Sequence, residues 1–388
     1  MHKFDVVMKS RVIFSAGSSE KVGKIGRDWN VHRVLLVTDA GITKAGLHNG
    51  LCESLRNEGI EIILFSHVEP NPTTDNVEQG VQVARTFSPD MIVALGGGSS
   101  LDAGKAINLV FCRGGKITDY RGMLSSGRKL LPLIAVPTTA GTGSEVSPFI
   151  LISDTRSHGK IVTRDLHLIP DIALLDPILT RSMPDRVTAI TGVDALVHGI
   201  EAYVAKGSQP YSQSLALRAV GMVCDALPRV LKHPDDLEER GKMLVASNLA
   251  GMAFALSYLG LAHAMANPLT RVAGMAHGMA VGMVVPYVIR FNEPMAQKEY
   301  ATMANQILGR QSSLDPREAT LQLAKSVRDL LTSVGFPQNL KAAGVPEDRL
   351  EEMAEEASRQ ATVQSNPREA TLQDLKELYR NAYEGALV

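Results

Sequence analysis

Short apolar runs alternate with longer stretches of helical spacing through the first half of the chain. The runs at 33–38, 61–65 and 91–95 are rich in Val, Leu and Ile and predict buried strands. Between them, apolar residues three and four positions apart predict helices over 41–57 and 74–87, and a further helix from about Leu101. Strands alternating with helices in this way favour a parallel sheet covered by helices on both faces.

The strand signal stops after Pro184, and the remaining segments have helical spacing almost throughout. The length of 388 residues also exceeds that of one ordinary core. The sequence therefore predicts two domains, an α/β domain at residues 1–180 and an all-helical domain at residues 181–388.

One stretch of the predicted helical domain, from Met243 to Met265, is apolar enough to resemble a membrane span. Polar residues, among them Ser247, Asn248 and His263, interrupt it, and its Ala and Gly content is typical of close helix packing. We predict one buried helix here and no membrane partner.

Composition excludes several function classes. The chain is 45% apolar and 21% charged with a formal net charge of -1, which is typical of a globular protein. No run of Lys or Arg is interleaved with aromatic residues, so no nucleic-acid partner is predicted. The three cysteines form no C-x-x-C pair, and no apolar signal segment opens the chain. Both observations favour the cytoplasm.

A glycine-rich turn, GGGSS at residues 96–100, separates the strand at 91–95 from the helix that follows. Glycines at a helix N-terminus let an anion approach unpaired backbone N–H groups, and pyrophosphate is the expected guest. The alternative is a βα turn that binds nothing. The run matches neither G-x-G-x-x-G nor a Walker A loop, in which Gly104 and Lys105 would have to lie one residue closer to Gly98.

Two further features support a dinucleotide site. The turn PTTAGTGSE at residues 137–145 follows a predicted strand at 131–136, and ligands bind outside the carboxyl ends of open parallel sheets. Asp39 follows the strand at 33–38, where its carboxylate can accept from an adenosine 2′-hydroxyl and would repel a 2′-phosphate. That role favours NAD over NADP, and the alternative role is a turn or N-cap aspartate.

Four separated side chains are candidate metal ligands. Asp194 and His198 lie four apart in a helical pattern, so both project from one helix face. His263 lies in the apolar stretch, and His277 follows in a Met-Ala-His-Gly segment. Three imidazoles and one carboxylate suit Fe²⁺ or Zn²⁺, whereas Mg²⁺ and Ca²⁺ prefer more oxygen ligands. Each histidine alone is more commonly a core or surface residue.

The sequence resembles the iron-containing, or group III, alcohol dehydrogenases over essentially its whole length. The resemblance rests on six segments, GGGSSLD (96–102), PTTAGTGSE (137–145), GVDALVHGIEAY (192–203), GLAHAM (260–265), HG (277–278) and NPR (366–368). It implies a dehydroquinate-synthase-like fold, with a Rossmann-like NAD-binding domain, an all-helical metal-binding domain and a homodimer.

The resemblance also assigns residues. It implies that the metal ligands, through which catalysis would act, are Asp194, His198, His263 and His277. The implied cofactor contacts are Asp39, Asn71, Gly97, Gly98, Ser99, Asp102, Thr138, Thr139, Thr142 and Lys160, with Asp102 near the nicotinamide. Small primary alcohols or aldehydes are the implied substrates, with hydride passing to or from NAD(H).

Three positions depart from the family pattern. Relatives often carry a second histidine four residues after the third ligand, where this chain has Asn267, and an amide cannot titrate. A proton relay would then use water or cofactor hydroxyls. Relatives also often show Asp and Cys where Gln360 and Thr362 stand. Our candidate substrate-pocket residues are Phe149, Leu151, Phe254, Leu259, Asn267 and Thr362. For the four apolar ones, a plain core role is the alternative.

Two other functions stay open at this point. One is a dehydroquinate-synthase-like or polyol-type enzyme that also uses NAD and a metal. A phosphorylated substrate would demand several Lys and Arg around the pocket. Few occur near residues 245–280, where Arg271 is the exception. The other is a protein that binds NAD and a metal without turnover.

Overall fold

The computed structural model describes residues 4–123, 127, 129–157, 159–308 and 314–387. It forms two compact units, which divide at residues 183 and 184. Residues 4–7 group with the helical unit, where Phe4 makes an edge contact with Tyr211 at 5.9 Å between ring centroids. The predicted division at residues 180 and 181 placed this N-terminal segment in the α/β domain.

The α/β unit contains a six-stranded parallel sheet in the order β1-β9-β6-β4-β2-β3. Its strands are β1 (Arg11–Phe14), β2 (Arg33–Asp39), β3 (Glu61–Val68), β4 (Met91–Gly96), β6 (Leu133–Pro137) and β9 (Ile172–Leu175). The central strands β4 and β6 are buried at every residue, as expected for a sheet covered on both faces. The predicted parallel fold is confirmed.

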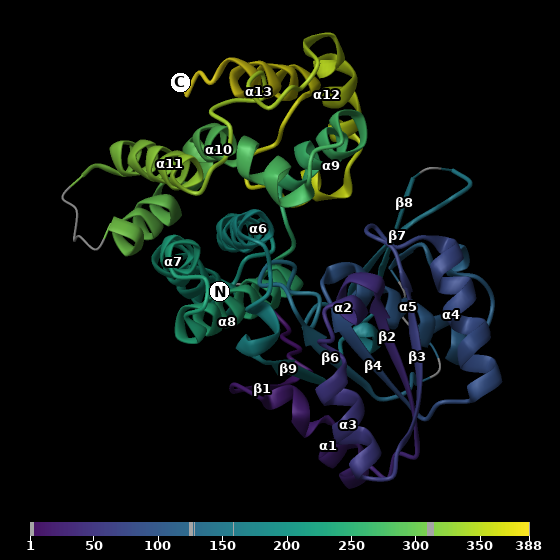
Figure 1. The fold of residues 1–388 in the computed structure, drawn as a ribbon. Helices are drawn as coiled ribbons and strands as arrows, with labels where there is room; N and C mark the ends of the chain where they lie inside the picture. Colours follow the sequence, from purple (N-terminus) through teal and green to yellow (C-terminus); the bar gives the residue numbers. More distant parts are fainter. Residues whose placement is uncertain (1–3, 124–126, 128, 158, 309–313, 388) are drawn as a thin grey trace. The chain divides into compact units, whose positions relative to one another are not determined.

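Helices cover both faces of this sheet, because successive strand side chains point in opposite directions. Leu35 and Val37 pack with α4 (Thr74–Phe87) and α5 (Gly98–Arg113), which run side by side in Figure 1. Val34 and Leu36 pack instead with the opposite layer, formed by α1 (Val22–Asp28) and α3 (Asn49–Asn57).

The helix predicted over 41–57 is two helices, α2 (Ala40–Lys44) and α3. The chain turns between them at Gly46, whose φ of 70° lies in the left-handed region that glycine adopts without strain. The expectation of one continuous helix over 41–57 was therefore wrong.

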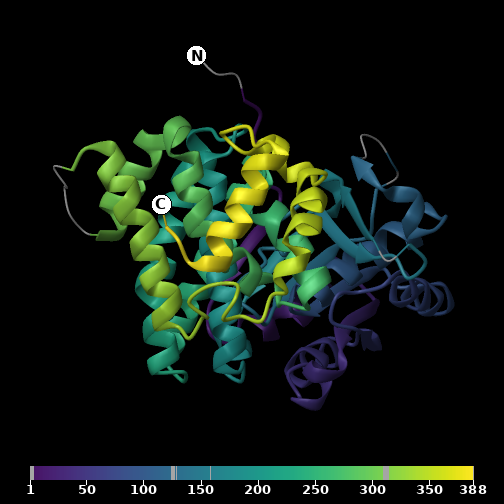
Figure 2. The same cartoon turned by 90° about the horizontal axis from the view of Figure 1, so that it is seen from above.

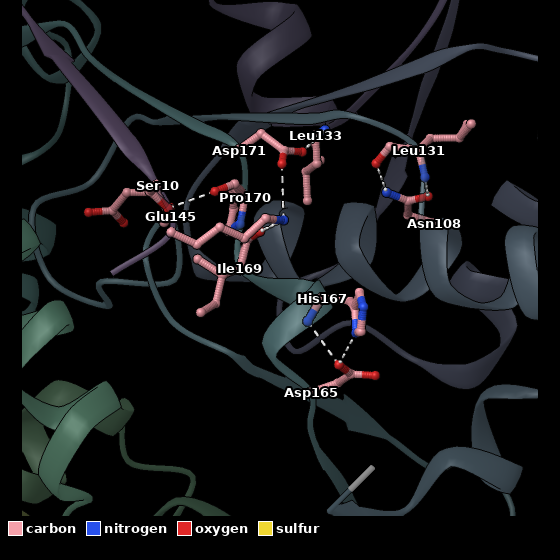
Figure 3. A network of polar contacts seen from close by, with 11 residues as sticks. Ser10, Asn108, Leu131, Leu133, Glu145, Asp165, His167, Ile169, Pro170 and Asp171 are labelled. Atoms are coloured by element: carbon pink, nitrogen blue, oxygen red, sulfur yellow. Dashed lines mark hydrogen bonds and ion pairs between the residues drawn. The ribbon is translucent and has the colours of Figure 1, made fainter. Parts of the chain in front are cut away.

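A small second sheet, in the order β5-β8-β7, was not anticipated. Its strands are β5 (Gly122–Met123), β7 (Phe149–Ser153) and β8 (Lys160–Arg164), and the short helices of this unit are η1 (Ser18–Lys21), η2 (Ile117–Tyr120), η3 (Leu166–Leu168) and η4 (Pro177–Thr180). Figure 3 shows polar contacts that hold the connections. Asp171 accepts from the Leu133 amide at 3.0 Å, Asn108 contacts Leu131 through both amide atoms, and Asp165 caps η3 at His167.

The second unit contains helices and no strand among its described residues. They are α6 (Asp185–Val204), α7 (Pro210–Lys232), α8 (Leu237–Ser257), α9 (Leu261–Ala273), α10 (His277–Leu308), α11 (Pro316–Ser333), η5 (Glu347–Arg349), α12 (Leu350–Ser358), η6 (Ala361–Ser365) and α13 (Leu372–Glu384). Helices α6, α7 and α8 pack together, and α12 contacts both α9 and α13. The yellow helices α12 and α13 lie side by side in both views (Figures 1 and 2).

The single helix predicted for Met243 to Met265 was also wrong. Helix α8 ends at Ser257 and α9 begins at Leu261, with a bend of 108° between them. In the connection, Tyr258 has a φ of 70° and a ψ of 179°, which no helix can contain. Among the described helices, none alone has the length and hydropathy of a membrane span, and only the bent α8–α9 pair passes that test when taken together.

Candidate metal centre and cofactor site

Helix α6 presents two of the predicted ligands on one face. Its 20 residues place Asp194 and His198 one turn apart, and both are 5% exposed. The other two come from different helices, since His263 lies in the first turn of α9 and His277 begins α10. Gly278 lets the start of α10 lie close to α6, because a Cβ at this position would be 2.2 Å from the Ile190 carbonyl oxygen of α6.

Three imidazoles surround one carboxylate oxygen. Asp194 Oδ1 lies 3.8 Å from His198 Nε2 and 3.9 Å from Nε2 of both His263 and His277. The ligand atoms of Asp194, His263 and His277 all lie within 4.8 Å of one another, and the rings of His198 and His263 stack at 4.9 Å. The structure thus brings together all four residues that the sequence pattern singled out.

The polar atoms at the centre of this cluster fit a divalent cation. Asp194 Oδ1 and His263 Nε2 are buried without a hydrogen-bond partner among the described residues, a costly arrangement unless something else binds them. Burial raises the pKa of Asp194 above its ordinary value, although His277 and His263 oppose the shift. A cation here would keep the carboxylate ionised.

A fifth side chain of this cluster, Glu201, was not among the residues predicted from the sequence. It lies on α6 seven residues after Asp194, is 3% exposed, and its Oε2 is 2.5 Å from His263 Nδ1. Burial alone would lower the pKa of His263, but the charge and hydrogen bond of Glu201 raise it. The available signal was an acidic residue two turns after Asp194, on the same helix and in its more apolar second half.

The glycine turn has the geometry expected for an anion. Helix α5 begins at Gly98, so Gly98 and Ser99 form its first turn, three residues before the predicted start near Leu101. The second loop lies directly against it, because a Cβ on Gly98 would be 2.8 Å from Thr142 Cγ2 and one on Gly97 would be 3.4 Å from Thr139 Cγ2. The Thr138 amide donates to the Gly96 carbonyl at 2.9 Å. The two loops therefore form one surface at the carboxyl ends of β4 and β6.

Asn71 and Lys160 flank this helix N-terminus. The Asn71 amide donates to Ser99 Oγ at 3.3 Å, and Lys160 Nζ donates to Asn71 Oδ1 at 3.1 Å. Partial burial lowers the pKa of Lys160, while Asp102 opposes that shift. An ammonium group beside a helix N-terminus favours an anionic guest.

Asp39 has the N-cap role that the sequence left open. Its Oδ1 accepts from the Ile42 amide at 3.0 Å, and its Oδ2 accepts from Ser100 Oγ at 2.9 Å. The carboxylate is partly exposed and lies beside the glycine turn, where a Cβ on Gly96 would be 3.1 Å from Oδ2. This placement is compatible with a ribose contact as well.

Asp102 belongs to a buried network that includes Lys105, a residue that the sequence analysis did not single out. Asp102 accepts from Ser144 Oγ at 2.5 Å and from the Leu151 amide at 2.9 Å. Lys105 Nζ donates to Ser144 Oγ at 2.9 Å and lies 3.9 Å from Asp102 Oδ1. Burial raises the pKa of Asp102 and lowers that of Lys105 to about 8. The network joins α5 to the second loop and to β7.

Comparison with known proteins identifies the family. The family model described as iron-containing alcohol dehydrogenase matches residues 9–177, and that described as the C-terminal part of the Fe-containing alcohol dehydrogenase family matches residues 188–383. The chain belongs to the iron-containing alcohol dehydrogenase family. It is therefore an enzyme, and an oxidoreductase.

Relatives of this iron-containing alcohol dehydrogenase match nearly end to end. The chain is 33% identical to the NAD-dependent methanol dehydrogenase of Bacillus methanolicus, over 95% of this chain and 97% of that protein. It is 33% identical to the 1,3-propanediol dehydrogenase of Citrobacter freundii, over 98% and 99%. A solved 1,3-propanediol oxidoreductase has a TM-score of 0.96 at 34% identity, over 98% and 100%. A sulfoacetaldehyde reductase from Bifidobacterium kashiwanohense, solved with NAD⁺, has a TM-score of 0.89 at 29% identity, and the match covers 98% of this chain and 99% of that one.

The predicted pocket residues of this iron-containing alcohol dehydrogenase have different surroundings. In the helical unit, Phe254 is buried and its ring lies 4.7 Å from that of His198, while Leu259 lies in the α8–α9 connection. Thr362, on η6, has a buried hydroxyl without a partner among the described residues. In the α/β unit, Phe149 is partly buried, and Leu151 is 40% exposed, so a plain core role for Leu151 was wrong.

Two of the three residues that depart from the family pattern contact each other. Asn267 Nδ2 donates to Gln360 Oε1 at 3.0 Å. Both side chains are partly exposed amides, and Asn267 lies one helical turn after His263 on α9. This enzyme thus has a neutral amide pair at these positions, and neither member can exchange a proton near neutral pH.

Proposed function

We propose that the chain transfers hydride between NAD(H) and a small primary alcohol or aldehyde, with Fe²⁺ as the working metal and Zn²⁺ as the alternative. The observation that carries the proposal is the convergence of three imidazole Nε2 atoms on Asp194 Oδ1 at 3.8–3.9 Å. The names of the methanol and 1,3-propanediol dehydrogenases support small alcohols as substrates.

In this proposal Asp194, His198, His263 and His277 hold the ion. Its chemistry when bound is Lewis acidity toward an alcohol or aldehyde oxygen. Phe254 packs against the His198 ring, with 4.7 Å between the ring centroids and 38° between the planes. Asn267 and Gln360 offer neutral hydrogen-bonding groups one turn away from His263 and leave proton transfer to water or to cofactor hydroxyls.

The cofactor would bind with its diphosphate at the start of α5. Gly97, Gly98 and Ser99 allow close approach to unpaired backbone N–H groups, and Lys160 adds a positive charge beside them. Thr138, Thr139, Thr142 and Asn71 border the same turn. Asp39 would accept from the 2′-hydroxyl of the adenosine ribose, and Asp102 would lie toward the nicotinamide.

The dehydroquinate-synthase-like alternative loses its one candidate anion-binding residue in the helical stretch. Arg271 binds Glu352 at 2.9 Å and also Glu356, so two carboxylates already neutralise its guanidinium. A phosphorylated sugar acid would need a cation that is not paired in this way.

We also propose a cytoplasmic homodimer, which rests on the family resemblance and on the cysteine pattern. Size-exclusion chromatography with light scattering measures the mass in solution, and a monomer would contradict the proposed assembly.

A panel of alcohols and aldehydes, assayed with NAD(H) and NADP(H) after anaerobic Fe²⁺ loading, tests the proposed activity. We expect turnover of short primary alcohols with NAD⁺, loss of activity after chelation, and recovery on adding Fe²⁺. Activity that survives complete metal removal, or none with any alcohol or aldehyde, would contradict the proposal.

A further inference from the structure

Glu201 contacts a metal-ligand candidate and the backbone that carries it. Its Oε2 lies 2.5 Å from His263 Nδ1 and accepts from the Gly260 amide at 3.0 Å. Its Oε1 accepts from the Ala262 amide at 2.6 Å. One carboxylate therefore fixes both the imidazole ring and the first turn of α9.

This arrangement compensates for a missing local cap. The N-cap residue of α9 is Gly260, which has no side chain, so the first amides of the helix need an acceptor from elsewhere. Glu201 supplies it from α6, the helix that also carries Asp194 and His198. The positions of ligands on α6 and α9 are thereby coupled through one side chain.

The burial of Glu201 is costly and needs a reason beyond capping. The residue is 3% exposed, and among the described residues its one ion-pair partner is His263. A buried carboxylate without a Lys or Arg partner costs several kcal/mol unless its hydrogen bonds are strong. Capping alone needs only a neutral acceptor, such as the one that Asn366 Oδ1 supplies to the Leu261 amide at 3.3 Å.

A carboxylate on Nδ1 determines what Nε2 can do. When Nδ1–H donates to Glu201, the ring proton stays on Nδ1 and the Nε2 lone pair remains available. Nε2 of His263 is the atom that faces Asp194 Oδ1 at 3.9 Å and has no hydrogen-bond partner within the described chain. The contact thus orients the ring and selects the tautomer required of a ligand.

We propose that Glu201 is a positioning residue of the metal centre, which holds His263 in the ligating orientation and tautomer and so sets the affinity for the divalent ion. The inference rests on the metal centre of the proposed function. Carboxylates in this position typically change metal affinity 10–100-fold.

The test compares metal affinity in two full-length variants. E201Q keeps the volume and one acceptor oxygen but removes the charge. The matched control is N366S, because Asn366 Oδ1 also accepts from the start of α9, at the Leu261 amide, and touches no ligand. Each protein is stripped of metal, its thermal stability is measured without metal, and Co²⁺ binding is titrated against a chromogenic chelator, with the visible spectrum of bound Co²⁺ recorded.

We expect E201Q to bind Co²⁺ roughly 10–100-fold more weakly than wild type with an altered spectrum. N366S should lose thermal stability yet keep its affinity within about threefold. Wild-type affinity in E201Q, or an equal loss in N366S, would overturn the role of Glu201 and leave the metal centre intact. Absence of Co²⁺ binding by the wild-type protein would overturn the metal centre as well, so the two failures are distinguishable.

E201D provides a second variant if E201Q does not fold. It keeps the charge and shortens the reach by one methylene, so His263 and the α9 amides cannot all be held at their present distances. We expect weaker Co²⁺ binding than in wild type, and unchanged binding would count against the proposal.

Discussion

At the scale of single residues, several side chains combine a structural contact with a chemical one. Asp39 caps α2 and accepts from Ser100, yet its carboxylate also borders the proposed diphosphate turn. Its structural role survives replacement by asparagine, which is an equally good N-cap residue, whereas its charge does not. The two roles can therefore be separated by one substitution.

We expect D39N to raise the kcat/KM for NADP⁺ relative to NAD⁺ by about tenfold, because it removes a negative charge near the expected 2′-phosphate. Steady-state kinetics with both cofactors measures the ratio. The control D28N removes an exposed carboxylate at the end of α1 and should leave the ratio unchanged. No change in D39N would remove Asp39 as the discriminator.

Lys105 is the residue with the clearest pH dependence. Burial lowers its pKa from 10.5 to about 8, so its charged form is disfavoured in the folded chain. Between pH 8 and 10.5 the unfolded chain then binds more protons than the folded one, and this group contributes stability that rises with pH. The free-energy cost of burying the charged Lys105 side chain is present in full below pH 8 and absent above pH 10.5.

K105M removes the donor to Ser144 and the countercharge of Asp102. We expect it to lower the free energy of unfolding at pH 7 by about 3 kcal/mol, since it leaves a buried carboxylate without its partner. Wild-type stability relative to K105M should also increase from pH 8 to 10.5. Urea unfolding followed by circular dichroism measures both, and K24M, on an exposed site of α1, serves as control. Equal stability of K105M and wild type would show that the network contributes nothing.

The residue pattern predicted the four clustered side chains and the glycine turn, because their spacing relative to helices and strands is short-range information. It did not predict Glu201 or Lys105. Each is a charged residue in a largely apolar helix, and its hydrogen-bond partners lie 39 to 62 positions away along the chain. Such partners become neighbours only through tertiary packing.

At the scale of elements, the connection between α8 and α9 contains Tyr258, the one non-glycine residue with a positive φ among the described residues of the helical unit. Tyr258 adopts a φ of 70° and a ψ of 179°, a region that is essentially restricted to glycine and costs about 1–3 kcal/mol for other residues. The strain allows the 108° bend that separates His263 from α8. The stretch is apolar on both sides of this connection and contains no proline there, so the sequence pattern alone did not reveal the bend.

We expect Y258G to be more stable than Y258A by about 1 kcal/mol, since both remove the side chain and only glycine relieves the backbone. Thermal unfolding of the two variants measures the difference. At Ala255, inside α8, the comparison should reverse, and A255G should be less stable than wild type by about 0.5–1 kcal/mol. A more stable Y258A would contradict the assigned strain.

The other elements were predicted where local patterns suffice. The helix over 74–87 agrees with α4 at both ends. Thr73 and Asn76 form a capping box at its start, and Ser88 ends it in the left-handed region. The small sheet of β5, β7 and β8 escaped prediction. Its alternation extends over five residues in β7 and β8 and two in β5, too short to separate from loop sequence.

At the scale of the whole molecule, the two proposed binding functions belong to different compact units. All four candidate ligands lie in the helical unit, and the glycine turn lies in the α/β unit. Metal removal should therefore lower the local stability of the helical unit and leave that of the α/β unit nearly unchanged.

We expect chelation to increase hydrogen exchange in α6 and at the starts of α9 and α10, with little change in β2, β4 and β6. A ligand present at 100 times its Kd stabilises the state that binds it by about 2.7 kcal/mol, which is the protection lost. Mass-spectrometric hydrogen exchange on metal-loaded and stripped protein measures it. Equal deprotection of the sheet would contradict a metal confined to the helical unit.

Asn366 lies late in the chain and joins α9 and α10, two helices that carry candidate metal ligands. It accepts from the start of α9 and exchanges two amide hydrogen bonds with Asn292 of α10, at 3.0 and 2.7 Å. The nascent polypeptide emerges in order, so the final imidazole at His277 leaves the ribosome well before Asn366 does. Helices α9 and α10 are therefore joined through Asn366 only after almost the whole chain has been synthesised.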